Sequence, residues 1–477
     1  MITLSKEQFD QLGSPIGSGS MGDAYWSHDK NLVYYFFRNR NDLKLLERIN
    51  FLSYHFINEL KSKGLFDYIT QRFNLPIDLV KYEQLYGIVL KKIPQEFFFN
   101  ESIFKGKEKT FKWFISEKLR NKYLNNKGNL WNFIEGIKNI SIIVDIFHNA
   151  HLVFYDLSYN NILFNELNGN VYFISWDSIG RFGLDRIGIF PYPDFVDPFL
   201  LSKDRGSIND PTDYSNLHSL AVLNYMLLYH RHPLRGGKVH DVNDEKRDEE
   251  LLMGSKALFI ENPYDKSNQI KSSNLSTYEL PYGDPKLRPY TLSGKYFKQL
   301  FDRAFIEGLH YPNKRPKPIE WVNAANKTLD LLIPCSNPKC EEKFFVYNNE
   351  KHPVCPYCKT QVKTSYPILN FYSKGLDNYT TDNQRFIVSE NKKIFFRHIN
   401  DNDRITQNTL SEDPLAVFSK ENQKWYLINK KLKGLFLLDQ HKLILPETKI
   451  ELKDGMKLLL DYPSNNRLVI VQFLNPG

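Results

Sequence analysis

The spacing of apolar residues divides the chain into a strand-rich beginning, a helical middle and a strand-rich end. Short apolar runs and turns over residues 1–40 predict strands, and the aromatic run NLVYYFFRN at 31–39 predicts a core strand. A further strand is predicted at 86–93, YGIVLKKI. Residues 41–64 have helical periodicity, which Asn41 or Asp42 can cap, with apolar positions at Leu43, Leu46, Ile49, Phe51, Phe56 and Leu60.

The middle of the chain is predominantly helical by the same criterion. Helices are predicted over 130–150, from 213 through YSNLHSLAVLNYMLLYH, and over 295–309 and 317–332. Between the first two, VFYDLSYNNILF and NVYFISWDSIG predict a strand, a polar loop, a strand and a turn. From about 366 onward the pattern becomes regular short apolar runs separated by turns, which predicts a β-sandwich.

Composition and charge narrow the function classes only a little. The 477 residues favour about two to four domains. A net charge of +8, spread along the chain, permits anionic partners but does not favour nucleic acid. The start MITLSKEQFDQLG lacks a basic-then-apolar signal, and no apolar run approaches the roughly 18–20 residues of a membrane span. We therefore expect a soluble, cytoplasmic protein without a membrane partner.

The cysteines are the clearest metal-binding pattern. All four lie within 24 positions, as the pairs Cys335-x4-Cys340 and Cys355-x2-Cys358 separated by 14 residues. Four thiolates on two such knuckles are typical of a closed, structural zinc site, so His352 nearby finds no vacant coordination position. The alternative is four free thiols. Because the segment carries both Lys and Glu, we favour a structural or protein-binding role over nucleic-acid binding.

The strongest catalytic pattern is Asp156-x4-Asn161 between two apolar strands. In phosphoryl transfer an Asp orients the acceptor hydroxyl and takes its proton, and a nearby Asn binds Mg²⁺. Asp177, 16 residues after Asn161, supplies a second carboxylate for Mg²⁺. Upstream, Gly17-Ser-Gly19-Ser-Met-Gly22 is a loop whose backbone N–H groups can approach phosphate oxygens closely. Separately, each pattern has a structural alternative, a turn or a polar hairpin loop.

In this order, the motifs resemble those of the bacterial protein-kinase-like proteins often grouped as helix-hairpin-helix kinases, which occur near phosphatase and tellurite-resistance genes. HPLRG and NPYDKSN are more specific to that family than the general kinase motifs. The matching pieces, within about residues 10–332, are IGSGSMGDAY, YDLSYNNILF, ISWDSIG, YPDFVDPFL, NLHSLAVLNYMLLYHRHPLRGG, FIENPYDKSN and LFDRAFIEGLHYPNKRPKPIEW.

The resemblance implies an α+β, two-lobed protein-kinase-like fold over residues 10–332, with an N-lobe at 10–95 and a C-lobe at 96–332. A zinc ribbon at 333–363 and a β-sandwich at 364–477 follow. The resemblance further implies ATP as nucleotide, a protein substrate or partner, and a phosphatase as another partner. It makes Gly17, Gly19 and Gly22 the phosphate cover, Asp156 the base, Asn161 and Asp177 the Mg²⁺ ligands, and Val89 to Lys92 the hinge that meets adenine.

One departure from the family pattern affects the activity directly. Aligning VYYFFR with the family strand places Tyr35 where a lysine should contact the phosphates. Tyrosine supplies no fixed positive charge. Arg38 should point to the other face of its strand, because side chains alternate, while Lys44 can enter from the following helix. Glu47 is the expected helix partner of the missing lysine.

Other departures fall on the segment after Asp177. The usual Asp-Phe-Gly is Asp177-Ser-Ile, and the residues before the base are Phe154-Tyr155 rather than His-Arg. The usual Ala-Pro-Glu is Asp197-Pro-Phe, so its glutamate is missing, and we expect Asp197 to pair with Arg315 instead. The helix that normally begins with an anchoring Asp has Asn216.

The C-terminal strands weakly resemble a forkhead-associated domain, through WYLIN and ELKDGMKLLL. The phosphothreonine-binding signatures of such domains are absent, leaving Arg385 and Arg397-His398 as weak candidates.

The catalytic motifs and the missing lysine leave two functions open for the whole chain: an active Ser/Thr-type protein kinase, or a pseudokinase that acts as a nucleotide-gated scaffold. Nucleic-acid binding through the cysteine module is a third, added role.

Overall fold

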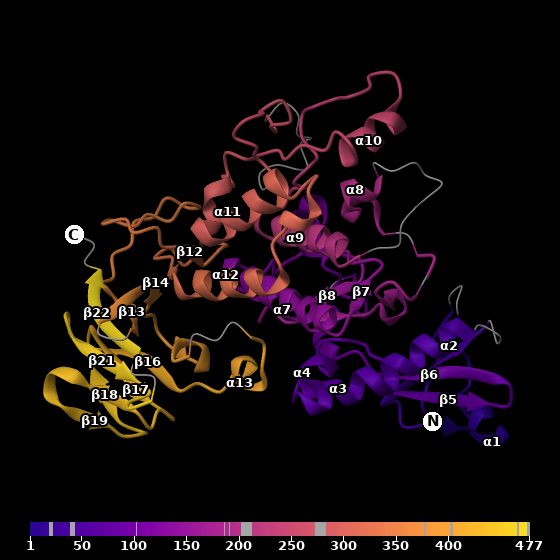
Figure 1. The fold of residues 1–477 in the computed structure, drawn as a ribbon, viewed down its shortest axis with the longest axis horizontal. Helices are drawn as coiled ribbons and strands as arrows, with labels where there is room; N and C mark the ends of the chain where they lie inside the picture. Colours follow the sequence, from indigo (N-terminus) through magenta and orange to yellow (C-terminus); the bar gives the residue numbers. More distant parts are fainter. Residues whose placement is uncertain are drawn as a thin grey trace.

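The computed structural model describes residues 1–18, 22–38, 43–101, 103–185, 187–189, 191–201, 212–271, 283–375, 378–400, 404–464 and 467–474. The class is mixed α+β, as predicted (Figure 1). A sheet near the N-terminus, a helical middle and two sheets near the C-terminus follow one another along the chain. Within these described ranges, no helix is both long enough and apolar enough to cross a bilayer.

The N-terminal sheet has six strands in the order β1-β5-β6-β4-β3-β2. Strand β1 pairs in parallel with β5, and the other neighbours are antiparallel. Alternation puts Phe36, Val80 and Val89 on one face and Phe37 and Ile88 on the other, which belongs to the main core. The strands are β1 Ile2–Thr3, β2 Gly17–Ser18, β3 Gly22–Trp26, β4 Leu32–Phe37, β5 Asp78–Tyr82 and β6 Leu85–Lys91.

A short helix, α1 (Lys6–Asp10), lies within the stretch that the pattern predicted as strands and turns. Its N-terminus is stabilised by a capping box, in which Ser5 and Gln8 each bind the other's backbone N–H. The ring of Phe9 stacks on Tyr82 with centroids 4.0 Å apart. Helix α1 thus covers the outer face of the sheet. The capping box favours a helix here, although the apolar pattern predicted strands and turns.

The predicted helix over 41–64 consists of α2 (Leu43–Asn50), a π-helical turn η1 (Phe51–Phe56) and α3 (Ile57–Ser62). Residues 41 and 42 lie outside the described residues, as does the side chain of Leu43. Of the apolar positions of the pattern, Ile49, Phe56 and Leu60 are buried, whereas Leu46 and Phe51 are half-buried and their neighbours Leu45 and Leu52 are buried instead. The wider π-turn shifts the buried face, because its hydrogen bonds span five residues.

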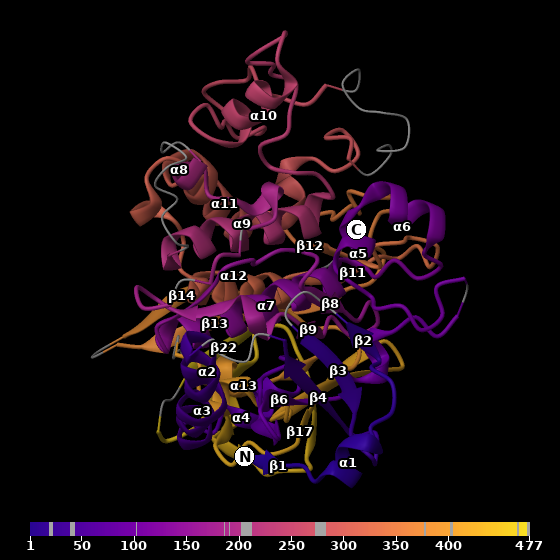
Figure 2. The same ribbon diagram turned by 90° about the vertical axis from the view of Figure 1, so that its right-hand side faces the viewer.

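Two almost fully buried helices, α7 (Leu130–Asn149) and α9 (Asp213–Tyr229), form the centre of the helical middle (Figures 1 and 2). Helix α12 (Pro318–Asp330) packs along α7. Two pairs of antiparallel strands, β7 with β10 and β8 with β9, lie beside these helices. These strands are β7 Leu152–Phe154, β8 Ile162–Phe164, β9 Val171–Phe173 and β10 Ile179–Arg181.

Shorter helices complete this part. They are α4 Phe66–Thr70, η2 Gln95–Phe97, α5 Lys112–Ile115, α6 Glu117–Tyr123, η3 Trp176–Ser178, η4 Pro193–Phe195, α8 Pro198–Leu201, α10 Glu245–Met253, η7 Tyr290–Ser293, α11 Gly294–Asp302, η8 Arg303–Glu307 and η9 Pro312–Lys314. The predicted helix at 295–309 therefore ends as a second π-turn, η8. Strands β11 (Leu332–Pro334) and β12 (Phe344–Val346) then form the small sheet that carries the first cysteine pair.

The C-terminal part has two antiparallel sheets, one with the strand order β14-β13-β22-β21-β18-β19 and one with the order β15-β16-β17-β20. Ring contacts join the sheets, Phe386 to Phe418 at 5.6 Å and Tyr366 to Trp425 at 5.8 Å. The elements are β13 Tyr366–Lys374, β14 Tyr379–Ile387, β15 Lys393–Ile394, η10 Phe396–His398, α13 Gln407–Leu410, β16 Ala416–Glu421, β17 Lys424–Asn429, β18 Leu435–Leu437, η11 Leu438–Gln440, β19 Lys442–Ile444, β20 Lys449–Glu451, β21 Lys457–Leu460 and β22 Arg467–Leu474.

A buried ionic cluster joins the helical middle to these sheets. The carboxylate of Asp330, at the end of α12, accepts hydrogen bonds from Arg397 at 2.9 Å and from Gln384 at 3.1 Å. His398 lies 3.2 Å away. Burial alone would raise the pKa of Asp330, but Arg397 and His398 hold it well below its usual range. The carboxylate is therefore ionised and paired at neutral pH.

We predict that Asp330→Ala lowers the free energy of unfolding by about 3–5 kcal/mol, because it leaves the half-buried Arg397 and the buried His398 without their shared carboxylate. The matched control is Asp413→Ala, which removes an exposed ion pair with Lys431 and should cost at most about 1 kcal/mol. Urea unfolding followed by tryptophan fluorescence measures both. Equal, small effects would contradict a stabilising role for the cluster.

Candidate functional site

The loop after β7 brings together two of the predicted site residues. The side-chain amide of Asn161 donates to the Asp156 carboxylate at 2.7 Å and to the Asp156 backbone carbonyl at 2.9 Å. The other carboxylate oxygen accepts the backbone N–H of Tyr192 at 3.0 Å. Because the nitrogen of the Asn161 amide faces Asp156, its carbonyl oxygen is the atom left to meet a cation. The Asp-x4-Asn spacing thus closes into one polar loop.

Asn216, on the buried helix α9, holds this loop by its backbone. Its amide oxygen accepts the N–H of Phe154 at 2.8 Å, and its amide nitrogen donates to the Phe154 carbonyl at 2.6 Å. A carboxylate at this position can only accept, so it could not satisfy the carbonyl. The departure from Asp to Asn therefore gains one buried hydrogen bond, and it fixes the strand two residues before Asp156.

Asp177 lies close enough to Asp156 for their charges to interact. Burial raises the pKa of Asp177, backbone N–H groups of its own turn and the charge of Arg48 oppose the rise, and the Asp156 carboxylate adds a smaller rise. Arg48, on α2, donates to the carbonyl oxygens of Asp177 at 2.7 Å and Ile179 at 2.9 Å. Its buried guanidinium thereby ties the helix to the turn that carries Asp177, and it brings positive charge to the site.

Tyr35 lies on β4 opposite Ala24 and Ile88. Its ring packs edge-on against Trp176, with centroids 5.7 Å apart. A Cβ added to Gly22 would come within 2.7 Å of this ring, so the glycine makes room for it. Burial, and then the charge of Asp177, raise the pKa of the Tyr35 hydroxyl. The residue at the expected lysine position therefore stays neutral, faces Asp177 and lies against the end of the glycine-rich hairpin.

Neither of the two nearby cations considered in place of the lysine packs against Tyr35. Arg38 pairs with Asp23 at 2.6 Å, on the face of the sheet away from Tyr35, as side-chain alternation predicted. Lys44 is exposed near the start of α2, and it makes no ion pair within the described part of the chain. Glu47, the predicted partner of the lysine, instead pairs with Arg181 at 3.1 Å. The helix is therefore tied to the segment after Asp177 by both Glu47 and Arg48.

The predicted phosphate cover is described only in part. Gly17 and Gly22 belong to the hairpin β2–β3, while Gly19 lies outside the described residues. In the predicted hinge, the N–H of Lys92 donates to the Asn31 carbonyl at 3.3 Å and its side chain is exposed. Next to it, Ile93 packs against a buried cluster formed by Phe97, Leu163 and Tyr172.

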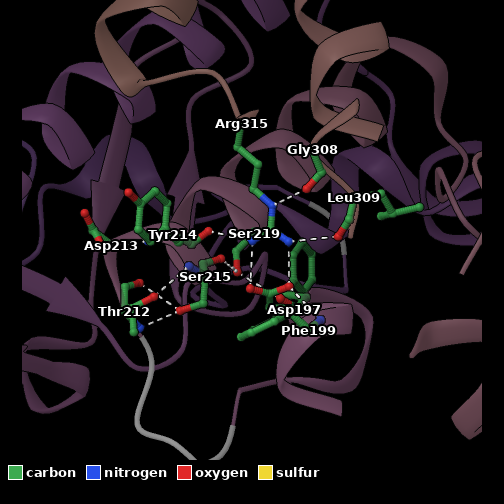
Figure 3. A network of polar contacts seen from close by, with 11 residues as sticks. Asp197, Phe199, Thr212, Asp213, Tyr214, Ser215, Ser219, Gly308, Leu309 and Arg315 are labelled. Carbon is green, nitrogen blue, oxygen red and sulfur yellow. Dashed lines mark hydrogen bonds and ion pairs between the residues drawn. The ribbon is translucent and has the colours of Figure 1, made fainter. Parts of the chain in front are cut away.

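Two further ionic contacts hold the segment between Asp177 and α9. Asp197 and Arg315 form a buried, two-pronged pair, with both oxygen–nitrogen distances 2.7 Å and neither side chain more than 2% exposed (Figure 3). Arg315 also donates to the carbonyls of Gly308, Leu309 and Tyr214. The predicted pairing of Asp197 with Arg315 is therefore present, and the first residue of Asp-Pro-Phe does the work expected of the missing glutamate.

The second contact comes from the HPLRG motif. Arg235 donates to Asp194 at 2.6 Å and to Glu249, on α10, at 2.5 Å. Asp194 also accepts a hydrogen bond from the hydroxyl of Tyr159, within the Asp156 loop, at 3.2 Å. These bonds connect the HPLRG motif to the segment whose Tyr192 N–H binds Asp156. Arg48, Arg235 and Tyr192 were not predicted as site residues, since each acts across a long sequence separation.

The four cysteines form a separate cluster. Their sulfur atoms all lie within 4.8 Å of one another, with Cys335 and Cys358 at 3.4 Å and Cys340 and Cys355 at 3.9 Å. Tetrahedral zinc with bonds of about 2.3 Å requires sulfur–sulfur distances of about 3.8 Å, whereas a disulfide is near 2 Å. The cluster thus fits a tetrahedral metal site such as zinc. His352 is exposed and does not belong to it.

The chemistry of the thiols agrees with a metal. Burial and the neighbouring Cys335 raise the pKa of the Cys340 thiol to about 11, although a backbone N–H from Glu342 opposes the rise. The backbone N–H of Asn337 also donates to the Cys335 sulfur at 3.4 Å. Thiols crowded in this way become thiolates together only when a cation balances their charge.

The weak phosphopeptide candidates are already engaged by other residues. Arg397 and His398 bind Asp330 in the buried ionic cluster that joins α12 to the C-terminal sheets. Arg385 donates to Asn349 at 2.5 Å. Arg397 and His398 therefore hold the C-terminal sheets to α12, and their contacts with other described residues do not favour a phosphate ligand.

No protein-family model matches the chain, and a search of curated proteins finds no match either. The family resemblance therefore remains a prediction carried by the sequence motifs. The side-chain contacts described above are independent of it.

We predict one zinc ion per chain, measured by elemental analysis of the purified protein, and its loss in Cys355→Ser, because three thiolates leave the tetrahedron incomplete. His352→Ala is the matched control and should retain the metal. A wild-type protein without zinc, or equal zinc in the serine variant, would contradict the site.

We also predict that Asn216→Asp lowers the melting temperature at neutral pH, by the equivalent of about 1–3 kcal/mol, since the Phe154 carbonyl loses its donor. Asn125→Asp, at an exposed position, is the control and should change little. If the Asn216→Asp variant is as stable as the wild type, the amide pairing is dispensable.

Proposed function

We propose that the chain is a protein-kinase-like phosphotransferase. Residues 10–95 and 96–332 are its two lobes, followed by a zinc ribbon at 333–363 and a β-sandwich at 364–477. The observation that carries the proposal is the grouping of Asp156 and Asn161 in one loop, near Asp177, whose neighbour Trp176 packs on Tyr35 next to Gly22 of the hairpin β2–β3. Such a grouping offers a carboxylate that can act as a base and oxygen donors for a cation, which supports the proposal.

The assignment of roles follows from the contacts. Asp156 accepts the proton of a Ser or Thr hydroxyl, since its carboxylate is oriented by Asn161 and by the Tyr192 N–H. The Asn161 carbonyl and the Asp177 carboxylate are the oxygen donors that Mg²⁺ prefers. The raised pKa of Asp177 fits this role, because a bound dication offsets the burial and the repulsion from Asp156. When bound, Mg²⁺ supplies charge neutralisation on the phosphates of ATP.

A second candidate function is a nucleotide-gated scaffold, and Tyr35 is the observation that favours it. Its neutral hydroxyl can donate a hydrogen bond to a phosphate but brings no charge. Because pre-placed positive charge carries much of phosphoryl-transfer catalysis, nucleotide can bind here without rapid turnover. In that case the zinc ribbon and the β-sandwich recruit the partner, for which the resemblance implies a phosphatase.

We predict that the wild type transfers labelled phosphate from Mg·ATP to itself or to a generic protein substrate. Asp156→Asn should reduce the rate by about 100-fold or more, because the base is lost while its shape is kept. Asp413→Asn, on an exposed ion pair, is the control and should retain the wild-type rate. If the wild type and both variants show the same background labelling, while Mg·ATP raises the melting temperature, the nucleotide-gated scaffold is the function instead.

We predict that Tyr35→Lys raises the transfer rate by at least about tenfold, since it restores a cation beside Asp177. Tyr34→Lys, one position earlier and on the opposite face of the strand, is the matched control and should give no increase. If neither Mg·ATP binding nor labelling is found in any variant, both nucleotide functions fail.

A further inference from the structure

Four aromatic side chains from residues 98–127 pack together next to the proposed transfer site. The ring of Phe104 lies 4.6 Å from Trp113 and 5.2 Å from Tyr123, between centroids, and Phe99 lies 5.4 Å from Trp113. All four rings are half-buried, and Ile103 at the loop tip is 82% exposed. An aromatic cluster that remains open to solvent in this way is characteristic of a binding surface.

Lysines surround these rings. The Lys107 ammonium lies 5.4 Å from the centre of Phe104, and that of Lys122 lies 5.1 Å from Tyr123. Together with Lys105 and Lys112, these lysines are exposed and make no ion pair with any described residue. We call the four lysines and the four rings the lysine–aromatic surface.

The charge of this segment is concentrated. Residues 98–127 contain eight Lys or Arg and three Glu, so they carry a net charge of +5 out of +8 for the whole chain. Lys109 and Lys127 are already paired, with Glu166 and Glu341. The lysine–aromatic surface thus contributes four of these eight basic residues, all exposed and without an ion pair to a described residue. Ser102 and the side chain of Glu117 lie outside the described residues.

Backbone bonds place this surface beside Asp156. The N–H of Phe111 donates to the Ile162 carbonyl at 2.8 Å, and the N–H of Phe164 donates to the Lys109 carbonyl at 2.9 Å. Lys112 lies 5.8 Å from the ring centre of Tyr159, which belongs to the loop between Asp156 and Asn161. A chain bound along the surface would thus pass close to the proposed base.

We propose that the lysine–aromatic surface binds a protein segment rich in Asp and Glu. Lysine ammonium groups are point charges that pair with flexible carboxylates, and the rings beneath them supply apolar contact. The exposed lysines meet no acidic side chain among the residues that the structure describes, so a partner is the source of the opposite charge.

Nucleic acid fits this surface less well than an acidic peptide does. Single-stranded nucleic acid needs ring faces on which bases can stack. Here Lys107 and Lys122 lie over the faces of Phe104 and Tyr123, and several ring pairs meet edge-on, at 85° for Phe104 with Tyr123 and at 77° for Phe99 with Trp113. Two of the four rings therefore already have a lysine over their faces, which leaves less room for stacked bases.

The binding proposed here does not depend on phosphoryl transfer, so it stands or falls separately from the proposed function. The test uses the full chain and a fluorescein-labelled peptide of alternating Asp and Glu, with binding measured by fluorescence anisotropy. Lys107→Glu/Lys122→Glu removes two positive charges from the surface. The control Lys433→Glu/Lys442→Glu makes the same change of net charge on exposed lysines near the C-terminal sheets.

We expect salt-sensitive binding of the acidic peptide to the wild type, to the control and to Asp156→Asn. We expect at least about tenfold weaker binding to Lys107→Glu/Lys122→Glu, because like charges then face each other. Absence of binding at low salt, or equal loss in both double variants, would overturn the proposal. Tighter binding of single-stranded RNA than of the peptide, lost in the same variant, would replace the acidic segment with nucleic acid.

Discussion

The pairing of the Asn216 amide with the backbone of Phe154 is the contact on which the candidate site depends. Asn216 is buried between α9 and β7, and its amide makes both hydrogen bonds, one with the N–H and one with the carbonyl of Phe154. Because Asp156 follows two residues later, the orientation of its carboxylate toward Asn161 depends on this anchor. A buried helix thus positions a polar loop, which is how rigid elements generally support reactive groups.

Other segments of the chain are also joined by buried polar contacts, in these cases by ion pairs. Arg315 holds the segment before α9 through Asp197, and Asp330 holds the C-terminal sheets through Arg397. Arg288 is buried against Glu342, next to Cys340, and so ties the cysteine module to the helical middle. Since a buried charge is tolerated only when it is paired, each of these contacts also fixes the relative position of the two segments that it joins.

The sequence predicted the long, periodic elements and the compact motifs well. Helices α7, α9 and α12, the proximity of Asp156 to Asn161 and the four-cysteine cluster all depend on short-range spacing, which one chain reveals by itself. Contacts between residues far apart in the sequence were harder to predict. Arg48 meets Asp177 from 129 positions away, and no local pattern distinguishes it from an ordinary helix arginine. The π-turn η1, which moved burial from Phe51 to Leu52, also leaves no periodic signal.

Tyr35 sharpens the functional question, because its ring occupies the region beside Trp176 and Gly22 where a phosphate-binding cation was expected. The most direct test of the central claim is a crystal structure of the protein with Mg²⁺ and a non-hydrolysable ATP analogue. We predict that Asn161 and Asp177 coordinate the cation, with the phosphates beneath the hairpin β2–β3 and Asp156 open to an acceptor hydroxyl. A nucleotide bound elsewhere, or a cation that meets neither residue, would contradict it.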